Sequence, residues 1–202
     1  MIEKFDCTKN YILEDERALL RPLQQDDFDR LLPFALNEPD LWKYSLVSGA
    51  GEEGLQNYMN ITFKAREEGK EYAFIVFDKK TNEYAGSTRF YDIQNDLQTV
   101  QLGYTWYGKQ FQGTGLNKHC KFLLLSFAFE QIGFERFELR ADNNNERSIA
   151  AMKSLGCKVD GILRSNMPTR TDGLRRDSIV LSILKDEWFD EVKENLRKRI
   201  SN

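Results

Sequence analysis

A short segment rich in glycine, Gln112-Gly113-Thr114-Gly115, stands between a strand-like run and a long apolar run with helical periodicity. Small residues let a ligand reach the backbone, and the first N–H groups of a helix have no partner inside that helix. The segment therefore has the residue types of an anion site built from main-chain amides. Glycine also tolerates positive φ angles at little steric cost, so a simple turn is the alternative interpretation.

Two common phosphate-binding motifs do not match this segment. A Walker A loop requires Gly-Lys followed by Ser or Thr, whereas Gly115 is followed by Leu116, Asn117 and Lys118. The dinucleotide fingerprint G-x-G-x-x-G requires glycine at position 118, and no βαβ unit precedes the segment. An anion site here would therefore serve a different kind of phosphate-containing ligand.

The sequence contains few residues that could form a metal site or a catalytic triad. His119 is the only histidine, so a histidine-based metal cluster or a Ser-His-Asp triad would depend on it alone. We expect it to be an ordinary helix residue. Cys7, Cys120 and Cys157 are odd in number and contain no C-x-x-C pair, which predicts reduced structural cysteines. We therefore expect no metal ion.

The composition is that of an ordinary globular chain. Of 202 residues, 41% are hydrophobic and 30% are charged, so a single domain over residues 1–202 is expected. The formal net charge of −3 argues against nucleic acid or an anionic membrane as a partner. The N-terminus lacks a signal-like apolar segment, and no run of about 18 apolar residues occurs. We therefore expect a cytoplasmic protein.

The elements that would position these residues follow from hydrophobic periodicity. Strands are expected at 18–21, 71–78, 83–93, 99–108, 136–141, 158–164 and 178–184. Helices are expected around 28–35, and at 54–68, 116–131, 146–155 and 186–199, with Gly156 as the C′ residue of the fourth. The strands 71–78 and 83–93 should form a hairpin. Strict alternation gives the strand 99–108 two faces, with Val100, Leu102 and Tyr104 on one and Gln101, Gly103 and Thr105 on the other.

Further motifs accompany the glycine segment in a fixed order. Gln112 to Leu116 matches R/Q-x-x-G-x-G/A except in its last place, where Asn117 stands; the others are LRPL at 20–23, AGSTRF at 85–90, LGYTW at 102–106, NNERSIAAMKSLGCKVDGILR at 144–164 and RRDSIVLSILKDEW at 175–188. Together they resemble the GNAT superfamily of acyl-CoA-dependent N-acyltransferases, in particular the branch that includes the ribosomal-protein N-terminal acetyltransferases. The resemblance extends from Leu19 to Trp188.

This resemblance implies a GNAT fold, a mixed α/β domain whose mostly antiparallel central sheet is splayed between its fourth and fifth strands and flanked by helices. It also implies acetyl-CoA as cosubstrate, with the diphosphate on main-chain amides at a helix N-terminus and the pantetheine arm beside the fourth strand as a false strand. The residues implied to bind it are Trp106, Tyr107, Gln112, Gly113, Thr114, Gly115, Leu116, Asn117, Lys118 and Asn145. A turn or N-cap role is the alternative for Asn145.

The reaction implied is direct attack of a neutral amine on the acetyl thioester, with the carbonyl polarised by a main-chain amide near Trp106 or Tyr107. Many relatives carry glutamate where Gln101 stands and a tyrosine acid where Met152 stands. Glutamine cannot act as a base, and Met152 is expected in the core. Ser148 remains as a hydroxyl that would donate to the leaving thiolate, with a first-turn helix role as the alternative.

The acceptor side is implied near Arg89, Tyr91 and Tyr104, of which Arg89 and Tyr91 should share one face of their strand. A solvated surface strand is the alternative. The function expected is N-acetyl transfer to a primary amine, either a small molecule or a protein N-terminus. The sequence leaves open which amine is the acceptor, whether the acyl group is longer than acetyl, and whether the protein forms a homodimer. The alternative function is a catalytically silent acyl-CoA-binding sensor or regulatory module.

Overall fold

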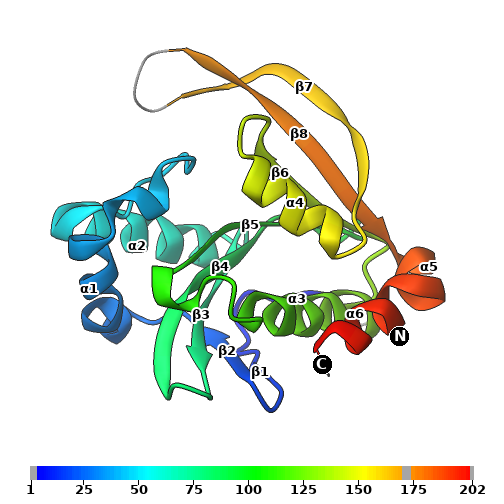
Figure 1. The fold of residues 1–202 in the computed structure, drawn as a ribbon, viewed down its shortest axis with the longest axis horizontal. Coiled ribbons are helices and arrows are strands. Elements are labelled where there is room, and N and C mark those ends of the chain that lie inside the picture. Colours follow the sequence, from blue (N-terminus) through cyan, green and yellow to red (C-terminus); the bar gives the residue numbers. More distant parts are fainter. Residues whose placement is uncertain (1–3, 170–173, 201–202) are drawn as a thin grey trace.

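The structure is a computed structural model, and it describes residues 4–169 and 174–200. Its described strands are β1 (Leu13–Glu14), β2 (Ala18–Pro22), β3 (Tyr72–Asp78), β4 (Glu83–Gln94), β5 (Thr99–Tyr107), β6 (Arg136–Asp142), β7 (Lys158–Pro168) and β8 (Arg175–Leu184). They form one sheet in the order β1-β2-β3-β4-β5-β6-β8-β7 (Figure 1). Neighbouring strands are antiparallel except β5 and β6, which are parallel.

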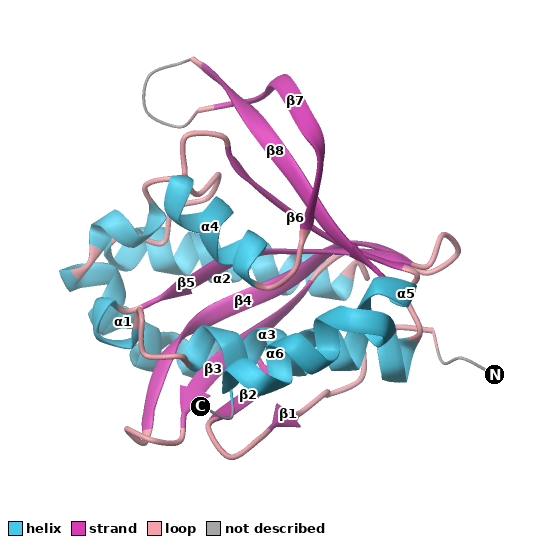
Figure 2. Ribbon diagram, turned by 45° about the vertical axis from the view of Figure 1, so that its right-hand side comes forward, coloured by secondary structure: helices cyan, strands magenta, loops and turns pink. Residues whose placement is uncertain are grey.

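Helices cover both faces of this sheet (Figure 2). They are α1 (Phe28–Asn37), α2 (Gly51–Glu67), α3 (Leu116–Ser126), α4 (Glu146–Ser154), α5 (Lys185–Glu187) and α6 (Lys193–Ile200). We call the face under α1 and α2 the α2 face, and the face under α3 and α6 the α3 face. Among the described residues no helix is long and apolar enough to cross a membrane.

Strand β3 explains why the sheet is buried on both sides. Phe74 and Val76 belong to the apolar cluster on the α3 face, whereas Ala73 and Ile75 belong to the cluster on the α2 face. Successive side chains of a strand point to opposite faces, so a central strand covered twice must be apolar throughout. The uninterrupted apolar run of β3 is therefore the sequence signature of a doubly covered sheet.

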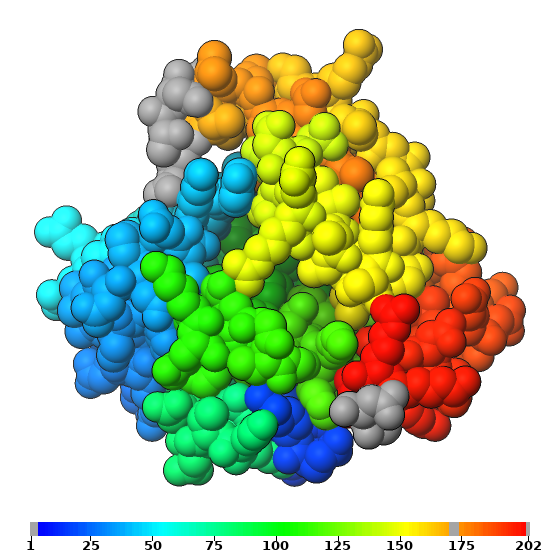
Figure 3. Space-filling view, in the orientation of Figure 1, coloured from blue at the N-terminus to red at the C-terminus, as the bar shows by residue number. Residues whose placement is uncertain are grey.

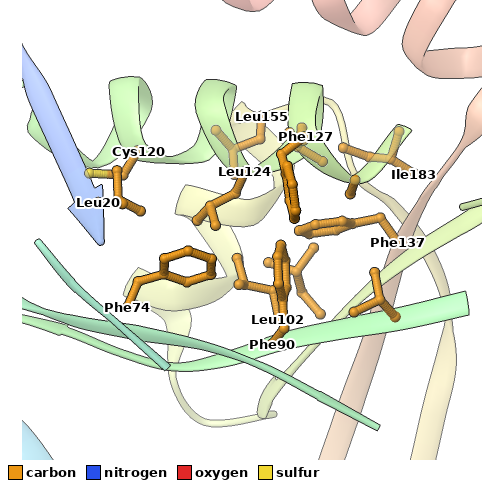
Figure 4. Packing of buried hydrophobic residues seen from close by; sticks show 14 of the residues in the cluster. Leu20, Phe74, Phe90, Leu102, Cys120, Leu124, Phe127, Phe137, Leu155 and Ile183 are labelled. Carbon is orange, nitrogen blue, oxygen red and sulfur yellow. The ribbon is translucent and has the colours of Figure 1, made fainter. Parts of the chain in front are cut away.

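The core on the α3 face combines aliphatic side chains with a group of packed phenylalanine rings (Figure 4). Phe127 follows α3 in a π-helical turn, Phe127–Ile132, and its ring lies 6.2 Å from that of Phe90. Phe90 in turn packs edge-on against Phe137 of β6 at 6.0 Å. The predicted helix 116–131 is thus present in position, but its last turn widens into a π turn that ends at Gly133.

Strands β5 and β6 pair over only part of their length. Their parallel ladder joins Thr99–Leu102 to Arg136–Leu139, and no pairing continues beyond it. Strand β6 instead stays paired with β8 up to Asp142. We call the gap bordered by residues 103–107 of β5 and 140–142 of β6 the inter-strand opening. The prediction of a sheet splayed between the fourth and fifth expected strands, which are β5 and β6, is confirmed.

A β-bulge at Tyr104 overturns part of the predicted strand phase. Tyr104 has φ 49°, and the register with β4 jumps from Arg89↔Gly103 to Ser87↔Trp106. Two residues of β5 therefore oppose one residue of β4, which shifts the alternation by one place. Tyr104 lies on the α2 face and Thr105 on the α3 face, so both expected placements are wrong.

Other sequence expectations agree with the structure. Strands β3 and β4 form the expected hairpin, and Gly156 follows the C-cap of α4 with φ 99°. The terminal helix expected at 186–199 is present but interrupted by a π-helical turn, Trp188–Val192. The two-residue strand β1 was not expected, because Leu13–Glu14 is too short to give a periodic signal.

Candidate active site

The glycine segment forms an open loop between β5 and α3. Gly113 has φ 77°, and Gly115, the N-cap of α3, has φ 92°. Both angles lie in the left-handed region that favours glycine, which agrees with the turn interpretation. A Cβ atom at either position would nevertheless meet no other atom within 4 Å. The loop therefore also presents bare backbone to open space, as an anion site requires.

Several amides of this loop lack partners. The N–H groups without a hydrogen bond to any described residue are those of Gly113, Thr114, Gly115 and Asn117. Side chains hold the loop from behind, because Gln112 Nε2 donates to the carbonyl of Tyr107 at 2.7 Å and Thr114 Oγ1 donates to that of Phe111 at 2.8 Å. Fixed amides at a helix N-terminus are a preformed site for phosphate oxygens.

A cation lies beside the loop that the sequence did not indicate. Arg17 Nη2 is 3.5 Å from Thr114 Oγ1, and Asp78 holds the same guanidinium through Nε at 2.8 Å. Arg17 and Thr114 are 97 positions apart, so no local pattern connects them. Asp78 neutralises the charge of this guanidinium, so Arg17 contributes a hydrogen-bond donor beside a loop whose helix dipole already favours anions. Together these groups supply the hydrogen-bond donors that a phosphate-containing ligand requires.

The inter-strand opening adjoins this loop. Figure 3 shows the surface hollowed between the blue segments on the left and the yellow segment of α4, with green atoms at the bottom. Trp106 and Tyr107 border the opening through their backbone, because their side chains are buried, Trp106 against Phe34 and Tyr107 in the core of the α3 face. Any contact of these two residues with a bound arm would therefore involve main-chain groups.

Helix α4 begins at the opening with Asn145 as its N-cap. Asn145 Oδ1 accepts a hydrogen bond from Ser148 N at 3.1 Å, so the alternative N-cap role is present. The Nδ2 group of Asn145 and the Ser148 hydroxyl have no hydrogen-bond partner in the described part of the chain. Both remain free for a ligand. Met152 is buried with 5% exposure, as expected for a core residue.

On the α2 face the structure brings Arg89, Tyr91 and Tyr104 together. The Arg89 guanidinium lies 4.3 Å from the centre of the Tyr104 ring, and the rings of Tyr91 and Tyr104 are 5.4 Å apart. Arg89 is 1% exposed and contacts Thr62 and Glu71, so the solvated-strand alternative is wrong for it. Burial raises the pKa of Tyr91 and of Tyr104 above the ordinary value of a phenol, so neither is a base near neutral pH.

Gln101 lies on this same face, opposite Tyr91 in the ladder between β4 and β5. Its Nε2 group donates to Asp92 Oδ2 at 2.6 Å, whereas its Oε1 atom is buried and accepts no hydrogen bond from a described residue. A buried acceptor without a donor carries a desolvation penalty that a ligand N–H group could remove. Asp92 was not among the site residues expected from the sequence.

A buried lysine lies on the opposite side of β5. Lys121 of α3 is 5% exposed, and its Nζ atom donates to Thr105 Oγ1 at 3.1 Å. The Thr105 hydroxyl also shares a hydrogen bond with Thr88 at 2.7 Å. Burial lowers the pKa of Lys121 to about 8. The sequence interpretation missed this residue, although a lysine inside the helical run LNKHCKFLLLS is the signal that could have found it.

The remaining titratable groups near α3 have simple explanations. His119 Nδ1 lies 2.8 Å from Asp15 Oδ2, with Glu16 beside it. This hydrogen bond accounts for the arrangement, and none of the three is assigned as a metal ligand. Burial raises the pKa of Cys120 and of Cys157 to about 12, so neither thiol is a nucleophile near neutral pH.

Comparison with known proteins identifies the class to which this fold and site belong. The family model described as acetyltransferase (GNAT) domain matches residues 17–158, and the chain is a member of that family of N-acetyltransferases. The family prediction from the sequence is therefore confirmed.

Particular relatives agree with this assignment. The uncharacterized N-acetyltransferase p20 of Bacillus licheniformis is 24% identical over 181 residues, which cover 87% of this chain and 97% of the relative. A GCN5-related N-acetyltransferase from Brucella melitensis has a TM-score of 0.87 at 22% identity, covering 95% of this chain and 86% of that one. Mycobacterium smegmatis RimJ, solved in complex with CoA-disulfide, has a TM-score of 0.75 at 17% identity, with coverages of 94% and 93%. The latter two show a shared fold.

Proposed function

We propose that this protein uses acetyl-CoA to acetylate a primary amine, and that the amine attacks the thioester directly. Acetyl-CoA supplies the activated acetyl group. The observation that carries the proposal is the set of unpartnered amides of the glycine loop, which stands where β5 leads out of the inter-strand opening. A loop that only turned the chain would have no need of a free donor cluster beside an unpaired strand edge.

The donor side of the site is the α3 face. Within residues 112–118, the free amides of the glycine loop bind the diphosphate of CoA together with the Arg17 guanidinium. The pantetheine arm lies in the opening, where main-chain groups of Trp106 and Tyr107 bind it as a false strand. Asn145 donates to an amide carbonyl of that arm through Nδ2, while its Oδ1 atom caps α4.

The acceptor approaches from the α2 face, where Arg89, Tyr91 and Tyr104 form the polar wall. Gln101 Oε1 accepts a hydrogen bond from the attacking nitrogen and so orients it. A main-chain amide of Trp106 or Tyr107 polarises the thioester carbonyl, and the Ser148 hydroxyl hydrogen bonds to the leaving sulfur. This arrangement places the two substrates on opposite faces of β5.

The acceptor enters the reaction as a neutral amine, because Gln101 offers no base. An α-amino group has a pKa near 8 and a lysine side chain one near 10.4, so at pH 7 the α-amino group has a far larger neutral fraction. A protein or peptide N-terminus is therefore a better acceptor for this site than a lysine side chain. RimJ, whose fold is shared, binds CoA-disulfide, which supports CoA as the carrier of the acetyl group.

One observation favours a second candidate function. The positions at which many relatives carry a glutamate base and a tyrosine acid are Gln101 and Met152 in this chain. A protein that binds acyl-CoA without turning it over, and serves as a sensor or regulatory module, would need neither group.

The experiment that separates these functions measures CoA release and product mass with a panel of amines. The panel contains two versions of one peptide. The first has a free N-terminus, and the second has a blocked N-terminus and a lysine. Polyamines and amino sugars complete the panel. We expect CoA release and a mass increase of one acetyl group, with the free N-terminus preferred. Binding of CoA without turnover of any amine would support the silent module, and no CoA binding would refute both functions.

A further inference from the structure

Lys121 is the most deeply buried lysine whose charge the described structure does not neutralise. It is 5% exposed, and no described carboxylate forms an ion pair with it. Its one hydrogen bond to a described residue is to Thr105 Oγ1, although an ammonium group has three N–H donors. Buried charges in proteins are normally paired, because an isolated ammonium loses its hydration without compensation.

The titratable neighbours of this ammonium do not replace the missing counter-charge. They are the thiols of Cys120 on α3 and of Cys157 between α4 and β7. Burial raises the pKa of both thiols to about 12, so both are neutral at physiological pH. The hydroxyls of Thr105 and Thr88 are neutral as well. A structural role would therefore be served as well by an uncharged side chain, and the position points to an anionic partner that arrives with a ligand.

The location of Lys121 indicates which atom of the ligand is the anionic partner of its ammonium group. Thr105 follows the bulge at Tyr104 and belongs to the part of β5 that is no longer paired with β6. Lys121 reaches it from α3, with Cys157 at the end of α4 as another neighbour. The ammonium therefore lies between the elements that border the inter-strand opening on the donor side. Two groups of the donor substrate gain negative charge during acyl transfer: the carbonyl oxygen, which the proposed mechanism pairs with a main-chain amide of β5, and the sulfur, which still needs a cationic partner.

We propose that Lys121 is a catalytic residue that stabilises the leaving thiolate of CoA and protonates it. This inference rests on the proposed function. As the amine nitrogen forms its bond to the carbonyl carbon, the carbon–sulfur bond breaks and its electron pair stays on sulfur. A proton then passes from Lys121 Nζ to sulfur, which gives the CoA thiol and a neutral Lys121. The neutral Lys121 side chain then takes up, through water, the proton that the acceptor nitrogen releases, and so regains its charge.

The test measures the pKa of the CoA thiol in the binary complex, by NMR of CoA isotopically labelled at the carbon bonded to sulfur. An opposite charge within about 4–6 Å lowers such a pKa by about 1–3 units. We expect the thiol pKa in the parent complex to lie below that of free CoA by at least about one unit. Lys121→Met should remove this decrease, whereas Lys153→Met, which deletes an exposed lysine of α4, should keep it.

Two further readouts distinguish this role from a structural one. Lys121→Met should be at least as stable to thermal unfolding as the parent, because a poorly paired buried charge is replaced by an apolar side chain. Its kcat should fall by about 100-fold or more, the usual effect of losing a general acid. Lys121→Gln, which keeps a donor but no charge, should behave like Lys121→Met in the thiol titration.

Two results would overturn the inference. Equal thiol pKa values in the parent complex and in free CoA would do so without any variant. The inference would also fail if the thiol pKa in the Lys121→Met complex equalled that in the parent complex. If Lys121→Met does not fold, the same comparison is made with Lys121→Gln. If the parent protein does not bind CoA, the proposed function fails first, and that failure is distinct because no complex exists to titrate.

Discussion

The glycine loop allows a controlled test of CoA binding, because the chain contains a second glycine with nearly the same geometry. Gly113 has φ 77° and Gly69 has φ 70°, and a Cβ atom at either would meet nothing within 4 Å. Gly69 lies just beyond α2, outside the glycine loop. Replacement of each by alanine therefore introduces similar backbone strain and no direct clash. This makes Gly69→Ala the matched control for Gly113→Ala.

The expected magnitudes separate strain from ligand binding. Alanine in the left-handed region costs about 1–2 kcal/mol, so each variant should lose a few degrees of Tm, at about 2–4 °C per kcal/mol in a chain of this size. Only Gly113→Ala should also weaken the binding of CoA, because its Cβ atom would occupy the open space through which a phosphate oxygen reaches the backbone N–H groups. Loss of one hydrogen bond from an amide to a phosphate oxygen costs about 1.5–3 kcal/mol, which is roughly a 10- to 150-fold increase in Kd.

Calorimetric titration with CoA and thermal unfolding of the same samples provide the two measurements. A nucleotide fragment that keeps the diphosphate but lacks pantetheine should lose affinity in the same proportion, because the contact is at the phosphates. The reasoning is refuted if Gly113→Ala has the Tm of Gly69→Ala and binds CoA as the parent does. In that case the loop is a turn and nothing more.

Three other predictions concern separate residues. Asn145→Ala should lose about 1 kcal/mol of unfolding free energy, because it removes the cap of α4, and up to tenfold in CoA affinity. Asn145→Ser can still cap the helix and should lose only the CoA affinity. An equal loss of affinity for the diphosphate fragment would contradict a contact with pantetheine. With a subsaturating alkylamine of pKa near 10, the rate should rise about tenfold per pH unit up to about pH 8, where loss of the Lys121 proton begins to level it, and Gln101→Glu should raise the rate near neutrality; a parent plateau near pH 6–7 would reveal a base elsewhere. Burial alone would raise the pKa of Asp27, but hydrogen bonds from Arg21 and the Gln24 amide hold it below its ordinary value. The stability that Asp27 contributes is therefore complete above the ordinary carboxyl pKa near 4, and it is lost as the pH falls through the lower pKa of the folded state. The unfolding free energy of Asp27→Asn should therefore depend less on pH below about 4 than that of the parent. Parallel plots of unfolding free energy against pH for the two proteins would be inconsistent with this.

The fold was largely predictable because its elements have strong local signals. The uninterrupted apolar run of β3, the four-residue connection to β4 and the glycine after α4 each specify a local structure by themselves. The tertiary arrangement then follows from burying those apolar faces. The π-helical turn after Phe127 was not predictable, since a widened turn has the same residue types as an ordinary helical turn.

The site was predictable only where chemistry is encoded locally. The glycine loop and the cap at Asn145 are local, whereas the pairing of Arg17 with Thr114 joins distant segments. The bulge at Tyr104 was missed because alternation assumes regular pairing, and a tyrosine at φ 49° gives no sequence signal. Lys121 was visible in the printed sequence as a lysine three positions before Leu124 on a buried helix face, but its burial depends on the packing of α4 and β5.

The bulge in β5 also has a practical consequence for anyone who wants to change the acceptor range by mutagenesis. Tyr104 and Trp106 point toward the α2 face, while Thr105 and Tyr107 point toward the α3 face. A combinatorial library aimed at the α2 face, where we propose that the acceptor binds, should therefore randomise Tyr104 and keep Thr105. A library designed on uninterrupted alternation from Val100 would choose Thr105 and Tyr107 instead, and would alter the α3 face, where we propose that the donor binds.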